Sequence, residues 1–338
     1  MNDETVGVIG AGSWGTTLAK VLGENGRRTL LWTRRPELTR EINETRKNEV
    51  YLPGVELPPN VEATHDLAKV SAGAQLLLLV VPSHGLRQIA FELGDHVSGE
   101  HVVVHATKGI EQESFKRMSE VLREETCVRK IGVLSGPNLA RELALGQPTG
   151  TLIASRYDEV FRRCHAALHN GYFRVYWGED VIGAEVGGAF KNIVSLASGI
   201  ATGLGFGDNT RALLVTRGIS EMARLGTSMG ANIMTFAGMA GIGDVVATCF
   251  SSLSRNHQLG LRLARGETLA SIQADMTMVA EGVKTSKAVY NYALRKGIDL
   301  PIVRAVYRVL YEDQSVGDAI RELMATPTGA EFLVSLPS

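Results

Sequence analysis

The chain has little cysteine and no long uninterrupted hydrophobic run. Its three cysteines are far apart among 338 residues and form no CxxC pair, which argues against a zinc site and favours a reducing compartment. The apolar run at 76–82 is too short to cross a membrane, and the stretch 186–207 contains Lys191 and six glycines. The first residues, MNDETVGVIGAG, lack the basic and apolar regions of a secretory signal. We therefore expect a cytoplasmic protein.

An excess of charge of one sign is lacking as well. The 35 lysines and arginines nearly balance the 36 aspartates and glutamates, giving a formal net charge of -1. This balance argues against a general attraction to nucleic acid or membranes, so any anion site must be a local cluster. Hydrophobic residues make up 44% and charged residues 21% of the chain, which is typical of a globular protein long enough for two domains.

Hydrophobic patterning divides the chain in two. In the first half, nearly continuous apolar segments alternate with helical or loop stretches, a pattern typical of a parallel sheet covered on both faces. The strand-like segments are 5–10, 29–33, 75–81, 101–106, 130–136, 151–155 and 172–177. Helical patterns then follow at 185–204, 209–225, 230–240, 256–265, 280–296, 301–310 and 315–324. We predict an α/β, Rossmann-type doubly wound domain at 1–186 and an all-α domain at 187–338.

A glycine-rich turn follows the first predicted strand. Gly10, Gly12 and Gly15 form a GxGxxG pattern between that strand and a helix, which is the context that a dinucleotide-binding turn requires. Gly10 permits the tight turn, Gly12 lets the backbone approach a pyrophosphate, and Gly15 lets the helix pack closely on the strand. Amide groups at the start of the helix would then face the anion. The alternative is a glycine-rich turn without a ligand.

Two arginines stand where the second predicted strand ends. In dinucleotide-binding domains an acidic residue about 20 residues past the glycine turn usually binds a free ribose 2′-hydroxyl. Here that place holds Thr33, Arg34 and Arg35, and arginine suits a 2′-phosphate. We predict a preference for NADPH, with NADH possible. The alternative is that both arginines are solvated surface charges.

Two isolated charges lie in otherwise apolar segments. Lys191 is the only charged residue in 186–207. Asp244 is the only one in 225–254. Unpaired buried charge is costly, so such residues usually find a partner or line a cavity. Having opposite signs, the two could share one site, where a lysine among apolar groups can exchange a proton near working pH. The alternatives are a lysine that extends to solvent at a helix edge and an aspartate that caps a helix after Gly243.

Polar residues accompany Lys191 at helical spacing. Ser195, Ser198 and Thr202 follow it at intervals of three and four, which places all four on one stripe of a helix.

Other basic residues could bind a phosphate group. Arg255 and Asn256 combine a planar fork with an amide at a possible helix start. Lys108 follows the predicted strand 101–106, and ligands of open α/β sheets bind at that edge; a plain surface lysine is the alternative. His101 and His105, and likewise His165 and His169, are four residues apart, but neither pair has an evident third ligand, so no metal site is predicted.

Eight segments in order along the chain resemble motifs of the bacterial-type NAD(P)-dependent glycerol-3-phosphate dehydrogenases. They are GAGSWGT, VVPSH, ATKGIE, LSGPNLARE, AFKNIVSLASGI, GIGDVVATC, SRNHQLG and VAEGVKT. The resemblance implies reversible hydride transfer between NAD(P)H and dihydroxyacetone phosphate, giving sn-glycerol 3-phosphate for phospholipid synthesis. It also implies a homodimer, and a helical second domain similar to the C-terminal domain of 6-phosphogluconate dehydrogenase.

The resemblance also implies roles for individual residues. Lys191 matches the proton donor and acceptor of the family, and Asp244 and Lys108 are expected beside it as catalytic residues. Cofactor contacts are implied for Ser13, Trp14, Arg34, Arg35, Lys108, Ala140, Arg255, Val279 and Glu281. Substrate contacts are implied for Lys108, Gly136, Asn138, Lys191, Asp244, Ser254, Arg255 and Asn256. The chain departs from the bacterial pattern at Asn138, where Ser or Thr is usual.

These residues suggest a mechanism, and two other interpretations remain open. Protonated Lys191, helped by Lys108, would stabilise the developing alkoxide and deliver the proton, so no metal is needed. A β-hydroxyacid or 6-phosphogluconate-type dehydrogenase would share the domain plan and the Lys-Asn helix motif, although SRNHQ after GIGD disfavours it. A nucleotide-sensing protein without chemistry would bind the cofactor but would give Lys108, Lys191 and Asp244 no role.

Overall fold

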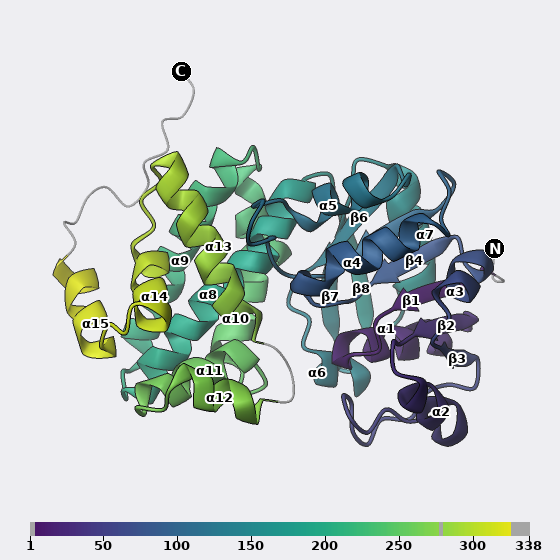
Figure 1. Ribbon diagram of the computed structural model, residues 1–338, viewed down its shortest axis with the longest axis horizontal. Coiled ribbons are helices and arrows are strands. Elements are labelled where there is room, and N and C mark those ends of the chain that lie inside the picture. Colours follow the sequence, from purple (N-terminus) through teal and green to yellow (C-terminus); the bar gives the residue numbers. More distant parts are fainter. Residues whose placement is uncertain (1–3, 277–279, 326–338) are drawn as a thin grey trace.

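The computed structural model describes residues 4–276 and 280–325, which form two lobes lying side by side (Figure 1). The first lobe contains an eight-stranded sheet with the strand order β3-β2-β1-β4-β5-β6-β7-β8. Its strands are β1 (Val6–Ile9), β2 (Thr29–Trp32), β3 (Val61–Thr64), β4 (Leu76–Leu79), β5 (Val102–His105), β6 (Lys130–Ser135), β7 (Thr149–Ala154) and β8 (Phe173–Gly178). The described part of the second lobe is helical. The predicted fold class, a Rossmann-type domain followed by a helical domain, is confirmed.

Strands β1 to β6 run parallel as predicted, whereas β7 pairs antiparallel with β6 and β8 runs parallel to β7. The helices of this lobe are α1 (Ser13–Glu24), α2 (Pro36–Thr45), α3 (Leu67–Gly73), α4 (Ser83–Gly94), α5 (Met118–Glu125), α6 (Ala140–Ala144) and α7 (Asp158–Leu168). The link from β6 to β7 holds only the short α6, which packs on α1. A parallel return needs a crossover, usually a helix, and the chain reverses instead. The predicted strands omit β3, whose four residues include a charged one.

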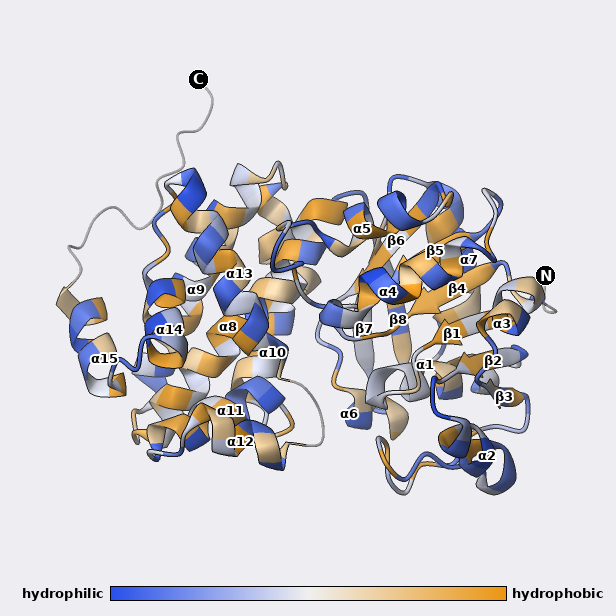
Figure 2. Ribbon diagram, in the orientation of Figure 1, coloured by the Kyte–Doolittle hydropathy of each residue, from blue (hydrophilic) through white to orange (hydrophobic). Residues whose placement is uncertain are grey.

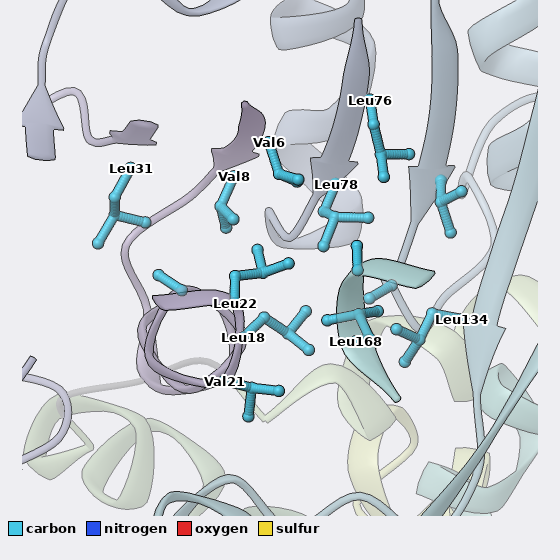
Figure 3. Close-up of a cluster of buried hydrophobic side chains, with 14 of the residues drawn as sticks. Val6, Val8, Leu18, Val21, Leu22, Leu31, Leu76, Leu78, Leu134 and Leu168 are labelled. Atoms are coloured by element: carbon cyan, nitrogen blue, oxygen red, sulfur yellow. The ribbon is translucent and has the colours of Figure 1, made fainter. Parts of the chain in front are cut away.

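Alternate residues of the central strands face opposite layers of helices. Val6 and Val8 of β1 pack with Leu22 of α1 on one face of the sheet (Figure 3). Leu77 and Leu79 of β4 belong to a second cluster on the other face, which includes residues of α3, α4 and α5. In Figure 2 the central strands are hydrophobic, while the helices that cover them carry hydrophilic residues as well. The central strands β1, β4 and β5 are therefore buried on both faces, which explains their uninterrupted apolar sequences.

The second lobe is arranged around α8. Its helices are α8 (Val181–Gly203), α9 (Asp208–Ser228), η1 (Ile233–Ala237), η2 (Met239–Gly243), α10 (Asp244–Phe250), α11 (Arg255–Ala264), α12 (Leu269–Asp275), α13 (Glu281–Lys296), α14 (Pro301–Tyr311) and α15 (Val316–Ala325). Helix α8 is buried at every residue from 183 to 201 and packs against α9, α10, α11 and α13. The domain division proposed from the sequence, between residues 186 and 187, falls inside α8.

The predicted helix at 230–240 is wrong in detail. The segment forms the 3₁₀ helix η1 and the π-helical turn η2. Gly238 separates them with φ −99° and ψ −159°, an extended conformation that interrupts a helix. The predicted helices also omit α10 and α12, which are seven residues each. Within the described part of the chain, no helix combines the length and the hydrophobicity that crossing a membrane would take.

Glycines in α8 let neighbouring backbones approach it closely. A Cβ added to Gly199 would lie 2.0 Å from the carbonyl oxygen of His257 in α11. A Cβ on Gly260 would lie 2.0 Å from the carbonyl oxygen of Leu196. Helices α8 and α11 therefore touch backbone to backbone, which only glycine allows. This contact explains why the apolar helix α8 contains glycine at its crossing with α11.

Candidate active site

The turn after β1 has the geometry of a dinucleotide site. Gly10 has φ +118°, and a Cβ on Gly15 would lie 1.8 Å from the carbonyl oxygen of Gly10. Gly12 precedes α1 without a side-chain cap, the first turn of α1 has no acidic residue, and a Cβ on Gly12 would meet nothing within 4 Å. An anion can thus approach the start of the helix. The turn also lies where the strand order changes direction, between β1 and β4, where such sheets bind ligands. These residues fit a nicotinamide dinucleotide.

The two arginines form a basic edge beside this turn. Arg34 and Arg35 are exposed at the carboxyl end of β2, and the Arg35 guanidinium lies 5.8 Å from the ring centre of Tyr51. The carbonyl of Tyr51 in turn accepts a hydrogen bond of 2.6 Å from the hydroxyl of Ser13 in α1. The segment around Tyr51 therefore connects the arginines to the glycine turn.

Helix α8 presents one face to the sheet and another to α10. On the first face, the Asn192 amide donates to the carbonyl oxygen of Lys108 at 3.4 Å. On the second, the Ser195 hydroxyl donates to the carbonyl oxygen of Thr248 at 3.2 Å, and Lys191 also points to α10. The polar stripe predicted from the sequence is thus the face that α8 turns toward α10 and α11.

Lys191 and Lys108 converge on the carboxylate of Asp244. The Lys191 ammonium donates to Asp244 Oδ1 at 2.9 Å and to the hydroxyl of Thr248 at 2.6 Å. The Lys108 ammonium donates to Asp244 Oδ2 and, at 3.2 Å, to the carbonyl oxygen of Gly136. The structure therefore brings together the two isolated charges of the sequence. It adds Lys108 from the loop after β5.

Burial sets the electrostatics of this cluster. Asp244 is 1% exposed and Lys191 8%. Burial alone would raise the pKa of Asp244, but the two neighbouring ammonium groups hold it below its ordinary value. Burial lowers the pKa of Lys108 to about 8, against the attraction of Asp244 and with the help of the Lys191 charge. A lysine with this pKa can gain or lose a proton near neutral pH.

Amide groups connect the cluster to α11 and α13. Asn256 is buried, and its side chain donates to Asn192 Oδ1 and accepts from the backbone N–H of Gly282, both at 2.9 Å. Ser254 caps α11 by accepting from the N–H of His257 at 3.3 Å. The start of α11 is thereby fixed against the helix that carries Lys191.

A contact between the lobes lies beside the start of α11. Glu281, the first residue of α13, accepts a 2.5 Å hydrogen bond from the hydroxyl of Ser83 and a 3.2 Å bond from its N–H. Arg255 is exposed at the start of α11, close enough to Glu281 for the two charges to interact. Arg255 and Glu281 therefore lie where the loop after β4 meets the helical lobe.

The loop after β6 contributes two further predicted residues. Gly136 has φ +143°, a conformation that favours glycine, and its carbonyl oxygen accepts from Lys108. The amide of Asn138 donates to the carbonyl oxygen of Gly150 at 3.0 Å and accepts from the hydroxyl of Thr151 at 3.0 Å. Asn138 is thus fixed to β7, and its role in substrate binding stays a prediction.

The remaining predicted cofactor residues lie around α1 or outside the described part. The ring of Trp14 packs edge-on against Phe173, with 6.4 Å between ring centres. The carbonyl of Ala140, at the start of α6, accepts a 3.1 Å hydrogen bond from the hydroxyl of Thr17. Val279 lies outside the described residues.

Sequence reasoning missed Thr248. Its hydroxyl donates to Asp244 Oδ1 at 3.3 Å and accepts from Lys191. The available signal was its place four residues after Asp244, on the same face of a short helix. In residues 4–276 and 280–325, no three histidine, cysteine, aspartate or glutamate residues are grouped so as to hold a metal ion.

Comparisons with known proteins cover nearly the whole chain. A family model described as NAD-dependent glycerol-3-phosphate dehydrogenase N-terminus matches residues 5–161, and the corresponding C-terminus model matches residues 180–321. Glycerol-3-phosphate dehydrogenase [NAD(P)+] of Geobacter sp. strain M21 is 45% identical over 331 residues, covering 97% of this chain and 99% of the relative. That of Moorella thermoacetica is 46% identical over 324 residues, covering 96% of each chain.

Solved structures agree with the sequence matches. The crystal structure of glycerol-3-phosphate dehydrogenase from Coxiella burnetii superposes with a TM-score of 0.93 at 34% identity, covering 96% of this chain and 100% of that one. A D-mandelate dehydrogenase, at 11% identity and a TM-score of 0.64, shares the fold alone. The chain therefore belongs to the NAD-dependent glycerol-3-phosphate dehydrogenase family of oxidoreductases.

Proposed function

We propose that this chain catalyses the reversible NAD(P)H-dependent reduction of dihydroxyacetone phosphate to sn-glycerol 3-phosphate, with Lys191 as proton donor and acceptor. The observation that carries the proposal is the convergence of Lys191 and Lys108 on the buried carboxylate of Asp244. This cluster lies at the carboxyl ends of the strands, on the edge of the sheet where the glycine turn also lies. The names of the relatives supply the substrate class.

The residues divide the work of the reaction. A nicotinamide dinucleotide held by the glycine turn at Gly10, Gly12 and Gly15 would supply or accept the hydride. As the carbonyl oxygen of the substrate becomes an alkoxide, the ammonium groups of Lys191 and Lys108 stabilise its charge, and Lys191 delivers a proton to it. Asp244 holds both ammonium groups in place, and Thr248 fixes the direction of the Lys191 ammonium. In the oxidative direction neutral Lys191 takes the proton from the substrate hydroxyl.

A substrate panel tests the proposal directly. The purified chain should oxidise NADPH or NADH in the presence of dihydroxyacetone phosphate. It should neither oxidise NAD(P)H with β-keto acids nor reduce NAD(P)⁺ with β-hydroxy acids or 6-phosphogluconate. Binding of the cofactor without turnover on any keto phosphate would contradict the proposal and favour a nucleotide sensor.

Arg255→Ala should impair use of the phosphorylated substrate. The guanidinium lies at the start of α11, near Asn256, where a substrate phosphate would meet a planar donor fork and a helix start. We expect KM for dihydroxyacetone phosphate to rise by about 10²-fold, since a charge-assisted hydrogen bond contributes roughly 1.5–3 kcal/mol. Steady-state kinetics would measure this KM, and the control is Arg265→Ala, which changes an exposed arginine at the end of α11. Equal reduction of unphosphorylated dihydroxyacetone by the parent enzyme would refute the phosphate role.

NADPH is the cofactor that we expect the chain to prefer, because Arg34 and Arg35 are exposed beside the glycine turn. Arg34→Glu should therefore weaken NADPH binding far more than NADH binding, since the new carboxylate would repel a 2′-phosphate. Fluorescence titration with each reduced cofactor would measure the two dissociation constants. Equal losses of affinity for NADPH and NADH would show that Arg34 is a solvated surface charge that does not bind the 2′-phosphate.

The cellular setting completes the proposal. We place the chain in the cytoplasm as a homodimer that supplies glycerophospholipid synthesis, without a nucleic acid or membrane partner. The three cysteines are free thiols, in keeping with a reducing compartment. We keep 1–186 as the cofactor domain and 187–338 as the catalytic domain, with α8 as the element that they share.

A further inference from the structure

A second buried charge cluster joins the two lobes at the start of α8. Glu185 is 4% exposed, and the mechanism above does not use it. Its carboxylate accepts from the Arg117 guanidinium at 2.6 Å and from the Ser119 N–H and hydroxyl at 2.7 and 2.8 Å. His105 Nε2 lies 3.1 Å from the same carboxylate. His105 ends β5, and the other two donors lie at the start of α5. One carboxylate of the helical lobe is thus held by two elements of the sheet lobe.

This cluster lies close in sequence to both lysines of the candidate active site. His105 is three residues before Lys108, and Glu185 is six residues before Lys191. Six helical residues rise about 9 Å, and α8 is buried along this whole stretch. The loop after β5 is also fixed, because the hydroxyl of Thr107 donates to the carbonyl oxygen of Val81 at 2.7 Å. Any sliding of α8 along β5 would therefore change the separation of the two ammonium groups.

We propose that Glu185 is a positioning residue, whose carboxylate pins α8 to β5 and α5 and so sets the separation of Lys108 and Lys191 across Asp244. The inference rests on the proposed function, because it takes the two lysines as the reacting groups. Glu185 acts through the helix rather than on the substrate. Removing its charge should change the chemistry at Lys191 without removing any group that touches substrate.

The charges around each group determine what the pH profile would report. His105 from β5 and Arg117 from the start of α5 face Glu185. Although burial opposes them, these partners hold its pKa below the ordinary value, so the carboxylate stays ionised. Asp244 from α10 and Lys191 from α8 face Lys108, whose pKa burial lowers to about 8. Because the ammonium form of Lys108 would stabilise the alkoxide, we expect the alkaline limb of kcat for reduction to follow the deprotonation of Lys108.

Glu185→Gln is the test. An amide accepts hydrogen bonds on one atom only, and its NH₂ group would face the Arg117 and Ser119 donors. We expect kcat to fall about 10²-fold, as a 1 Å misplacement of reacting groups can cause, while KM for NADPH stays within about threefold. We also expect the alkaline limb to move upward by roughly one pH unit, because a loosened site desolvates Lys108 less.

A matched control is Glu221→Gln in α9. Glu221 is also buried, but its carboxylate accepts from the N–H groups of Ile302 and Val303 in α14, within the helical lobe. This variant should lower Tm without moving the alkaline limb. If Glu185→Gln does not fold, Ser119→Ala is the second test, because it removes one hydroxyl donor to Glu185 and keeps the backbone N–H donor. The alkaline limb of kcat for Ser119→Ala should move in the same direction by a smaller amount.

The outcomes separate this inference from the proposed function. An unmoved alkaline limb in Glu185→Gln, or in Ser119→Ala where the first variant is unfolded, would overturn the positioning role even if stability falls. Wild-type turnover in Lys191→Ala would overturn the function instead. An inactive Lys191→Ala together with an unmoved limb would refute the positioning role alone.

Discussion

Replacing Lys191 with alanine should lower kcat for the reduction of dihydroxyacetone phosphate by about 10²–10⁴-fold, the usual contribution of a general acid. NADPH binding should change little, because Lys191 points from α8 to Asp244 and Thr248 rather than to the glycine turn after β1. The folded state should persist, since Lys108 still pairs with Asp244. Steady-state kinetics and a fluorescence titration with NADPH would measure the two effects separately.

Two further variants identify the source of the loss. Lys191→Arg keeps a positive charge, but a guanidinium does not release its proton in proteins. This variant should therefore bind substrate and remain slow, which distinguishes proton transfer from charge stabilisation. Lys296→Ala, exposed in the last turn of α13, serves as the control and should turn over normally. Turnover of Lys191→Ala within a few-fold of the parent would end the mechanism.

The fold was predictable because burial imposes simple patterns. Strands β1 and β4 are apolar on both faces since helices cover both, and they stand out as VGVI and LLLL. The short strand β3 and the reversal at β7 were not predictable in this way. Strand β3 owes its place to pairing with β2. Strand β7 reverses after the short α6, which packs on α1, and such a tertiary contact leaves no periodic pattern in the sequence.

The reacting groups were predictable because they are exceptions to the patterns around them. Lys191 and Asp244 are isolated charges in apolar segments, and the cost of burying charge made a shared site the natural inference. The residues that form hydrogen bonds with Lys191 and Asn192 were harder to predict. Asn256 was predicted only as a phosphate ligand, and its hydrogen bond to Asn192 was not predicted. Thr248 follows Asp244 at helical spacing, but that spacing does not indicate its hydrogen bond with Lys191.

Buried clusters between the lobes were the least predictable part. No role was predicted for Glu185, although it accepts hydrogen bonds from Arg117 and Ser119, which are more than sixty residues away. The link depends on how β5 and α5 lie against the start of α8. Such a contact becomes visible only when the two lobes are placed together.

Asp244→Asn should affect both activity and stability, because it removes the carboxylate that two ammonium groups share. Removing one partner of a buried ion pair usually costs about 3–5 kcal/mol of unfolding free energy. We also expect kcat at pH 7 to fall by about 10²-fold, as for the loss of one preorganised electrostatic contact. Denaturant unfolding and steady-state kinetics would measure the two losses. Asp208→Asn, which removes an exposed partner of Arg211, should change neither.

The pH dependence gives Asp244→Asn a signature of its own. Asp244 raises the pKa of Lys108, so without its charge that pKa should fall below about 8. Since reduction needs the ammonium form, the alkaline limb of kcat should move to lower pH, opposite to the shift expected for Glu185→Gln. The pKa of Lys108 is lower in the folded chain than in the unfolded chain, so between these two pKa values the unfolded chain binds more protons. The free energy of unfolding therefore rises with pH across that range. The stability deficit of Asp244→Asn should therefore be larger at pH 6 than at about pH 9.5, and a deficit that grows with pH would contradict the shared-carboxylate arrangement.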